Sequence, residues 1–136
     1  MLTCTEGEER LPKDYNEGLV SAILCPIMEE EAIEKMPELE KPKKTANMLL
    51  LGVHKNYRGK NIANNLVRLS LSIIKDAGYE NVPLFAASHF SNRVSEKNGF
   101  TSIYELDVKN WLWKGEKLLQ TMEEQHRYYK YWVKKL

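Results

Sequence analysis

The fold is decided by residues 48–78, MLLLGVHKNYRGKNIANNLVRLSLSIIKDAG. Residues 48–53 form an apolar run whose length is typical of a central strand buried on both faces. Residues 54–60 are polar and basic and contain one glycine. Apolar residues then recur at helical spacing, followed by a glycine where a helix is expected to end: Ile62, Leu66, Leu69, Ile73, Ala77 and Gly78. This stretch therefore predicts a strand, a basic loop and a helix.

The junction of this loop and helix predicts a binding site for a phosphate or pyrophosphate. The first N–H groups of a helix have no partner within it and carry partial positive charge, so an anion there gains hydrogen bonds and a favourable dipole. Gly59 allows the backbone to approach the anion closely, and Arg58 and Lys60 add positive charge at the rim. The alternative for these two cations is a solvated basic turn. Neither the Walker pattern GxxxxGK[ST] nor the dinucleotide pattern GxGxxG is present.

Shorter patterns on either side of this stretch predict the remaining elements. Residues 82–87 and 100–108 are expected to be strands, the second with one slip in its alternation, and residues 88–98 a helix that stops at Gly99. Residues 18–28, GLVSAILCPIM, form a short apolar run that we interpret as a buried strand. Residues 29–44 fit either a short helix or an irregular acidic loop. The aromatic segment 128–133 is predicted to be a closing strand, and residues 2–5 a short one.

Length and composition restrict the class of protein. A chain of 136 residues, 43% of them hydrophobic, is expected to form a single α/β domain over residues 1–136. With 20 basic and 19 acidic residues the net charge is only +1, so we expect no nucleic-acid partner. Trp111, Trp113 and Trp132 are interpreted as core or interface anchors rather than base-stacking groups.

No signal peptide or long apolar segment is recognisable, so the expectation is a cytoplasmic protein without a membrane partner. Cys4 and Cys25 lack the spacing of a zinc site or a disulfide framework. We therefore expect no metal, and two reduced thiols of which one is exposed and one buried. The oligomeric state is left open between a monomer and a homodimer.

The loop resembles the acetyl-CoA-binding signature of the GNAT superfamily of N-acetyltransferases, approximately V-x-P-x-Y-R-G-K-G-I-G/A. The chain reads VHKNYRGKNIA over residues 53–63, with Lys55 in place of the proline and Asn61 in place of the central glycine. Asparagine tolerates unusual backbone angles better than most residues, so we expect the loop to form nevertheless. A second match, SEKNGF at residues 95–100, resembles the superfamily's Y-E-K-x-G-F at the end of the following helix. Residues 87–91, ASHFS, are similar to the T-S-x-Y-S segment of invertebrate arylalkylamine and dopamine N-acetyltransferases.

The resemblance implies a mixed, mostly antiparallel central sheet flanked by helices, with a V-shaped opening between the strands at residues 48–53 and 82–87. Acetyl-CoA would insert its pantetheine arm there as a co-substrate, with Leu51 and Val53 bonding it through their backbones. The residues that the resemblance implies for cofactor binding are Leu51, Val53, Arg58, Gly59, Lys60, Asn61, Ile62, Ala63, Asn64, Ser91 and Asn92. The candidate catalytic residues are Ser88, His89 and Ser91. The tyrosine that supplies the acid in many family members is replaced here by Ser95.

Each catalytic candidate also has a structural interpretation. Ser88 and Ser91 can cap a helix, a role that is compatible with substrate contact. His89 is a candidate base because histidine titrates near neutral pH, but it equally suits a helix start. We interpret His54 and His126 as ordinary surface residues. The acidic residues 29–31 are interpreted as a solvated face rather than a patch that attracts amines.

The predicted function is transfer of an acetyl group from acetyl-CoA to a small primary amine, an arylalkylamine in particular. Only 17 residues precede Gly18, where the family has a strand and two helices, so the N-terminal elements are expected to be short or missing. Two alternatives follow. In the first, the chain is a catalytically impaired acyl-CoA-binding or interaction module. In the second, it is a protein N-acetyltransferase.

Overall fold

A three-stranded antiparallel sheet lies at the centre of the computed structural model, which describes residues 17–41, 43–48 and 51–136. The strands are β1 (Asn81–Ala86), β2 (Thr101–Asp107) and β5 (Tyr128–Lys135), in the order β1-β5-β2. All three were predicted, with ends correct to within two residues. The predicted short strand at residues 2–5 lies outside the described residues.

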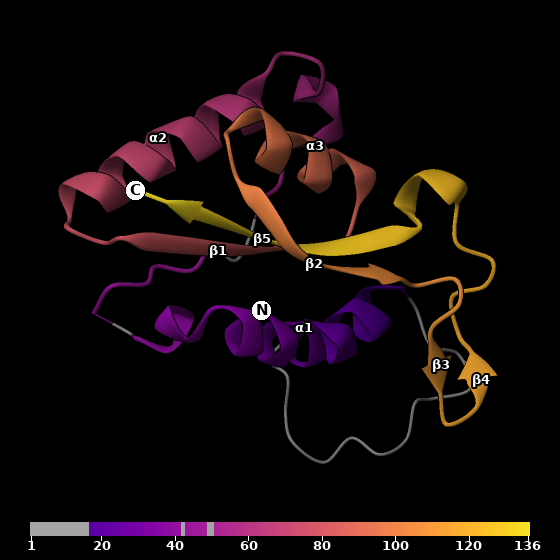
Figure 1. Ribbon diagram of the computed structural model, residues 1–136. Helices are drawn as coiled ribbons and strands as arrows, with labels where there is room; N and C mark the ends of the chain where they lie inside the picture. The colour runs from indigo at the N-terminus through magenta and orange to yellow at the C-terminus, as the bar shows by residue number, and fades with distance from the viewer. Residues whose placement is uncertain (1–16, 42, 49–50) are drawn as a thin grey trace.

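The last strand, β5, occupies the middle of the sheet and pairs with both neighbours (Figure 1). Trp132, for example, lies opposite Leu84 of β1 and Ser102 of β2. The register of β2 shifts between Ser102 and Tyr104, at a bulge that accounts for the slip in its alternating pattern. Because side chains alternate along a strand, β5 supplies apolar groups to both faces of the sheet.

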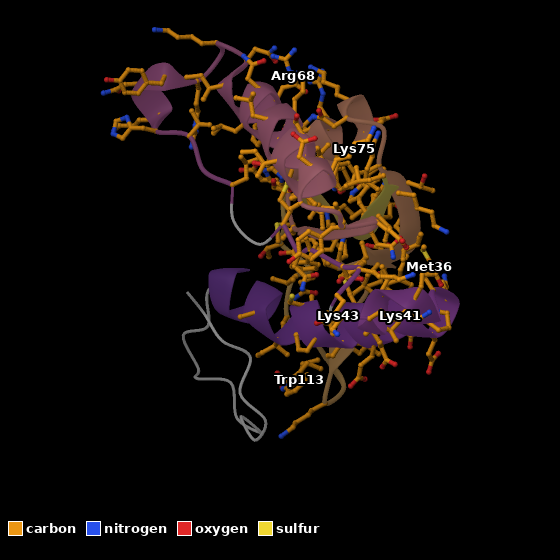
Figure 2. All side chains as sticks on the ribbon, turned by 90° about the vertical axis from the view of Figure 1, so that its left-hand side faces the viewer. Met36, Lys41, Lys43, Arg68, Lys75 and Trp113 are labelled. Atoms are coloured by element: carbon orange, nitrogen blue, oxygen red, sulfur yellow. The ribbon has the colours of Figure 1, made fainter. Side chains whose placement is uncertain are left out.

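Two layers of helix cover those faces. Helices α2 (Ile62–Asp76) and α3 (His89–Lys97) lie on one face, and α1 (Glu17–Lys35) lies on the other (Figure 1). Figure 2 shows Arg68 and Lys75 of α2 on the opposite side of the molecule from Lys41 and Lys43, which follow α1. The core under α2 and α3 contains Val67, Leu71, Val82, Leu84, Ala86, Phe100 and Trp132. The core under α1 contains Leu24, Met28, Ala32, Val108, Leu119, Met122, Tyr129, Tyr131 and Val133, with Leu39.

The strand predicted over residues 18–28 is wrong, because these residues belong to α1. Leu24, Met28 and Ala32 are fully buried, and their spacing of four residues is that of one helix face. Periodicity alone cannot distinguish a short buried helix segment from a strand. The acidic residues that follow are good helix formers and extend α1 to Lys35. A short 3-10 helix, η1 (Pro37–Glu40), comes next, so the helical alternative for residues 29–44 is the better one.

The prediction of a buried central strand over residues 48–53 is also wrong. Residues 45–48 run parallel to the edge of β1, with bridges from Thr45 to Asn81 and from Met48 to Leu84. The amide of Met48 donates to the carbonyl of Pro83 at 3.2 Å. Residues 51–53 have no regular secondary structure, and Leu51 is 37% exposed; residues 49 and 50 lie outside the described part.

Helix α2 was predicted correctly, but most of the apolar residues that indicated it in the sequence are not the ones that it buries. Val67 and Leu71 pack on the sheet, whereas Leu66, Leu69 and Ile73 are 43%, 57% and 70% exposed. The two stripes are adjacent on the helix and both have helical spacing, so the pattern could not decide between them.

Helix α3 ends where predicted, since Gly99 has a φ of +76°. Chain elements that the sequence did not reveal are the 3-10 helices η2 (Lys55–Tyr57) and η3 (Glu124–His126) and the hairpin of β3 (Leu112–Trp113) and β4 (Glu116–Lys117). None of the helices in the described ranges is long and apolar enough to cross a membrane.

Candidate functional site

A cavity of about 570 Å³ lies between the loop before α2 and the exposed face of α3. The size is that of a small-molecule or cofactor site. The loop side contributes Leu51, Gly52, Val53, Tyr57, Arg58, Gly59, Asn61, Ile62, Ala63 and Asn64. The opposite side contributes Ser88, Phe90, Ser91, Arg93, Val94 and Lys97. The N-terminal ends of both helices therefore face one space.

The start of α2 presents unpartnered backbone donors to this cavity. Asn61 is the N-cap residue, with φ 60° and ψ 23°, and its side chain makes no capping hydrogen bond. The N–H groups of Ile62, Ala63 and Asn64 have no acceptor within the described ranges of the chain. Such a helix start binds an anion through several N–H groups and the helix dipole.

Two residues in the loop adopt the left-handed backbone conformation. Gly59 has a φ of +79°, which costs glycine little, and Asn61 stands where the family pattern has glycine. The expectation that asparagine would allow the loop to form is thus confirmed by its conformation. The loop is further stabilised where His54 Nδ1 accepts a hydrogen bond from the amide of Asn56 at 3.2 Å.

The start of α3 is capped by two serines. Ser88 Oγ accepts from the amide of Ser91 at 3.1 Å, and Ser91 Oγ accepts from the amide of Ser88 at 3.2 Å. The two hydroxyls are 2.9 Å apart. This capping box confirms the capping role for both residues. Since both also line the cavity, a second role toward a ligand remains a prediction.

A histidine far along the chain anchors the same helix start. His126 Nδ1 accepts a hydrogen bond from the amide of His89 at 2.9 Å, which fixes Nδ1 as the unprotonated nitrogen. The exposed ring of Phe90 packs between the two imidazoles, with centroids 5.7 Å from His89 and 5.9 Å from His126. The interpretation of His126 as an ordinary surface residue is therefore wrong.

An ion-pair network holds η3, and with it His126, against the end of β2. Arg127 donates from Nε and Nη2 to the two oxygens of Asp107, at 3.0 and 2.9 Å. This bidentate pair holds the pKa of the Asp107 carboxyl at about 2. Glu124 accepts from Arg127 at 2.9 Å and from Lys109 at 3.0 Å.

We expect His126→Ala to loosen the start of α3, because the amide of His89 loses its acceptor. In His126→Asn the shorter amide can place an oxygen near the former Nδ1 position and should restore the bond. Hydrogen exchange of the amides at residues 89–91 is the measurement, with an acceleration of about 5- to 10-fold expected in the alanine variant only, as loss of one hydrogen bond implies. Equal protection in all three proteins would contradict the anchoring role.

Most predicted cofactor residues lie on the cavity: Leu51, Val53, Arg58, Gly59, Asn61, Ile62, Ala63, Asn64 and Ser91. Lys60 and Asn92 are not among its lining residues. Lys60 Nζ lies over the ring of Tyr57, at 5.7 Å. Asn92 donates to the carbonyl of Tyr128 at 3.0 Å and accepts from Trp132 Nε1 at 2.8 Å, so both ends of its amide hold α3 to β5.

Of the predicted catalytic residues, Ser88 and Ser91 line the cavity and His89 does not. Ser95, which replaces the family's tyrosine, is fully buried and donates to the carbonyl of Ser91 at 2.8 Å. It therefore stabilises α3 and presents no hydroxyl to the cavity. Any proton transfer in the cavity has to use other groups.

The sequence analysis missed five side chains of the lining: Tyr57, Val94, Phe90, Arg93 and Lys97. The last three follow one another at intervals of three and four residues, which places them on one stripe of α3. That spacing was legible in the sequence. Within the described ranges, the lining residues include three cations, Arg58 being the third, and no carboxylate.

No family model matches the sequence. The structure is similar to that of a mosquito arylalkylamine N-acetyltransferase-like protein, 5b, with a TM-score of 0.69 and 25% identity over 95% of this chain and 59% of that one. For arylalkylamine N-acetyltransferase 2 from Aedes aegypti the TM-score is 0.69 and the identity 23%, over 80% and 51% of the two chains. For the polyamine N-acetyltransferase of Drosophila melanogaster the TM-score is 0.57 and the identity 19%, over 82% of this chain and 63% of that one.

The chain therefore has the fold of the GNAT N-acetyltransferases and is similar in structure to an insect arylalkylamine N-acetyltransferase and to a protein like it. The predicted mixed sheet flanked by helices is confirmed. The chain spans between half and two thirds of the length of these structures.

Proposed function

We propose that this chain binds acetyl-CoA and transfers its acetyl group to a small primary amine. One observation carries the proposal: the uncapped start of α2 and the serine-capped start of α3 face each other across one cavity, whose lining in the described part of the chain has cations and no carboxylate. This combination suits a ligand with a diphosphate at one end and a reactive group at the other.

The diphosphate of acetyl-CoA would occupy the start of α2. The N–H groups of Ile62, Ala63 and Asn64 would donate to it, with Arg58 adding charge. The backbone groups of Leu51 and Val53 have no hydrogen-bond partner in the described chain, so they are free to bond the amides of the pantetheine arm. The V-shaped opening that the family resemblance implies is part of this proposal, because the pantetheine arm would lie in it.

The reaction needs a neutral amine that attacks the thioester carbonyl carbon. A C–N bond forms and the C–S bond breaks, the amine proton passes to a base, and the departing thiolate takes up a proton. In this proposal Ser88 and Ser91, whose hydroxyls are 2.9 Å apart at the cavity, would relay such a proton. His89 remains a candidate base in this proposal.

An arylalkylamine is the acceptor we favour. Phe90 lines the cavity, is 64% exposed and is flanked by the His126 ring, which offers an aromatic surface to an aryl group. Two of the similar structures are arylalkylamine N-acetyltransferases or like them, which supports the same choice.

The test has two stages, on the full chain. Calorimetric titration with acetyl-CoA measures binding, and release of the CoA thiol is then followed with tryptamine, phenethylamine, agmatine and a lysine peptide. We expect binding, and thiol release with the two arylalkylamines. Binding of acetyl-CoA without thiol release for any amine would favour the acyl-CoA-binding module. Thiol release with the peptide alone would favour a protein N-acetyltransferase. No binding of acetyl-CoA would overturn the proposal.

A further inference from the structure

Two cations on α3 have no role in the site as described so far. Arg93 and Lys97 line the cavity, are exposed, and have no carboxylate partner within the described ranges. They are four residues apart on one helix, which puts them on the same face and about 6 Å apart along its axis. The sequence analysis assigned neither of them.

We infer that Arg93 and Lys97 bind the 3′-phosphate of CoA and make the site select CoA over 3′-dephospho-CoA. The inference rests on the proposed function and adds to it a phosphate subsite on α3. A phosphate monoester carries close to two negative charges at neutral pH, because its second pKa is about 6. Two unpaired cations one helical turn apart match that charge.

The diphosphate is already accounted for on the other wall. It takes the unpartnered N–H groups at the start of α2 and the charge of Arg58. The 3′-phosphate of the same ligand therefore requires cations other than Arg58. Of the described lining residues, only Arg93 and Lys97 remain as cations.

The two helices are fixed relative to each other at this point, so the two subsites keep a constant separation. Asn98 Nδ2 at the end of α3 donates to Asn64 Oδ1 in the first turn of α2, at 2.8 Å, and to the carbonyl of Val94 at 2.8 Å. Lys134 Nζ of β5 donates to the carbonyl of Asn98 at 2.9 Å. A pre-organised pair of subsites suits a ligand whose phosphates are joined by a ribose.

The experiment compares the binding of CoA and of 3′-dephospho-CoA to three proteins by calorimetry. They are the parent chain, Arg93→Ala/Lys97→Ala, and the control Arg68→Ala/Lys75→Ala. The control removes the same charge from the neighbouring helix α2, at exposed positions that do not line the cavity (Figure 2). It corrects for any effect of net charge alone.

We expect the parent chain and the control to prefer CoA by about 10- to 100-fold, as two charge-assisted contacts imply. The Arg93→Ala/Lys97→Ala variant should bind 3′-dephospho-CoA as the parent does and lose the preference. Equal affinity of the parent for both nucleotides, or equal weakening of both in the variant, would overturn the inference and leave the proposed function intact. Failure of the parent to bind either nucleotide would overturn both.

Discussion

Ala63→Glu should abolish the binding of acetyl-CoA without loosening the fold. Ala63 is the second residue of α2, is half-buried and lines the cavity. A glutamate there places a carboxylate beside the N–H groups proposed for the diphosphate and competes for them. We expect the affinity to fall at least about 100-fold, because charged hydrogen bonds are lost and a like charge is added. A carboxylate in the first turn interacts favourably with the helix dipole, so thermal stability should stay level or rise.

The matched control is Leu69→Glu, which adds the same charge to the same helix. Leu69 is 57% exposed, lies six residues further along and does not line the cavity. The affinity of the Leu69→Glu variant for acetyl-CoA should stay within about twofold of that of the parent, since an exposed charge at that distance is largely screened. Calorimetry and thermal melting of both variants measure the two effects. Undiminished affinity in Ala63→Glu would refute the diphosphate site at the start of α2.

The loop and α2 were predictable because each local signal indicated the same structure. The change from apolar to basic residues at 54–60 marked the loop, and the helical spacing from Ile62 marked the helix. Asn61 was the weak point of the pattern, and its φ of 60° shows that asparagine adopts the left-handed conformation at the position where the family pattern has glycine.

Helix α1 was not predictable, because its burial depends on a contact that the sequence does not display. Leu24, Met28 and Ala32 are buried against the face of the sheet that also carries Tyr129 and Tyr131. The same apolar run would suit a strand if a neighbouring strand were available. Tertiary packing, rather than local preference, decides between the two.

The site was only partly predictable, for a related reason. The resemblance supplied the loop wall residue by residue, but it covered α3 only at its two ends. Arg93 lies between those ends and Lys97 within the second of them, and their role depends on which face of α3 meets α2. His126 lies 37 residues from His89 along the chain, so only the folded structure brings them together.

Trp132→Ala should have the largest effect on stability. Trp132 is 6% exposed in the middle of β5 and belongs to the core under α2 and α3. Its truncation leaves a cavity and removes the donor to Asn92 Oδ1, at 2.8 Å in the parent. We expect the free energy of unfolding to fall by about 3–5 kcal/mol, measured by chemical denaturation.

Two further variants separate packing from hydrogen bonding. Trp132→Phe keeps an apolar ring but leaves Asn92 Oδ1 without its donor, and should cost about 2 kcal/mol. Trp113→Ala removes the same side chain from the hairpin strand β3, where Trp113 is half-buried and belongs to neither core, and should cost about 1 kcal/mol. If Trp132→Ala cost no more than Trp113→Ala, Trp132 would not be the anchor of this core. Asn92 also joins α3 to β5, so loss of Trp132 should displace α3, which forms one side of the acetyl-CoA site, and weaken acetyl-CoA binding. Loss of Trp113 should not weaken it.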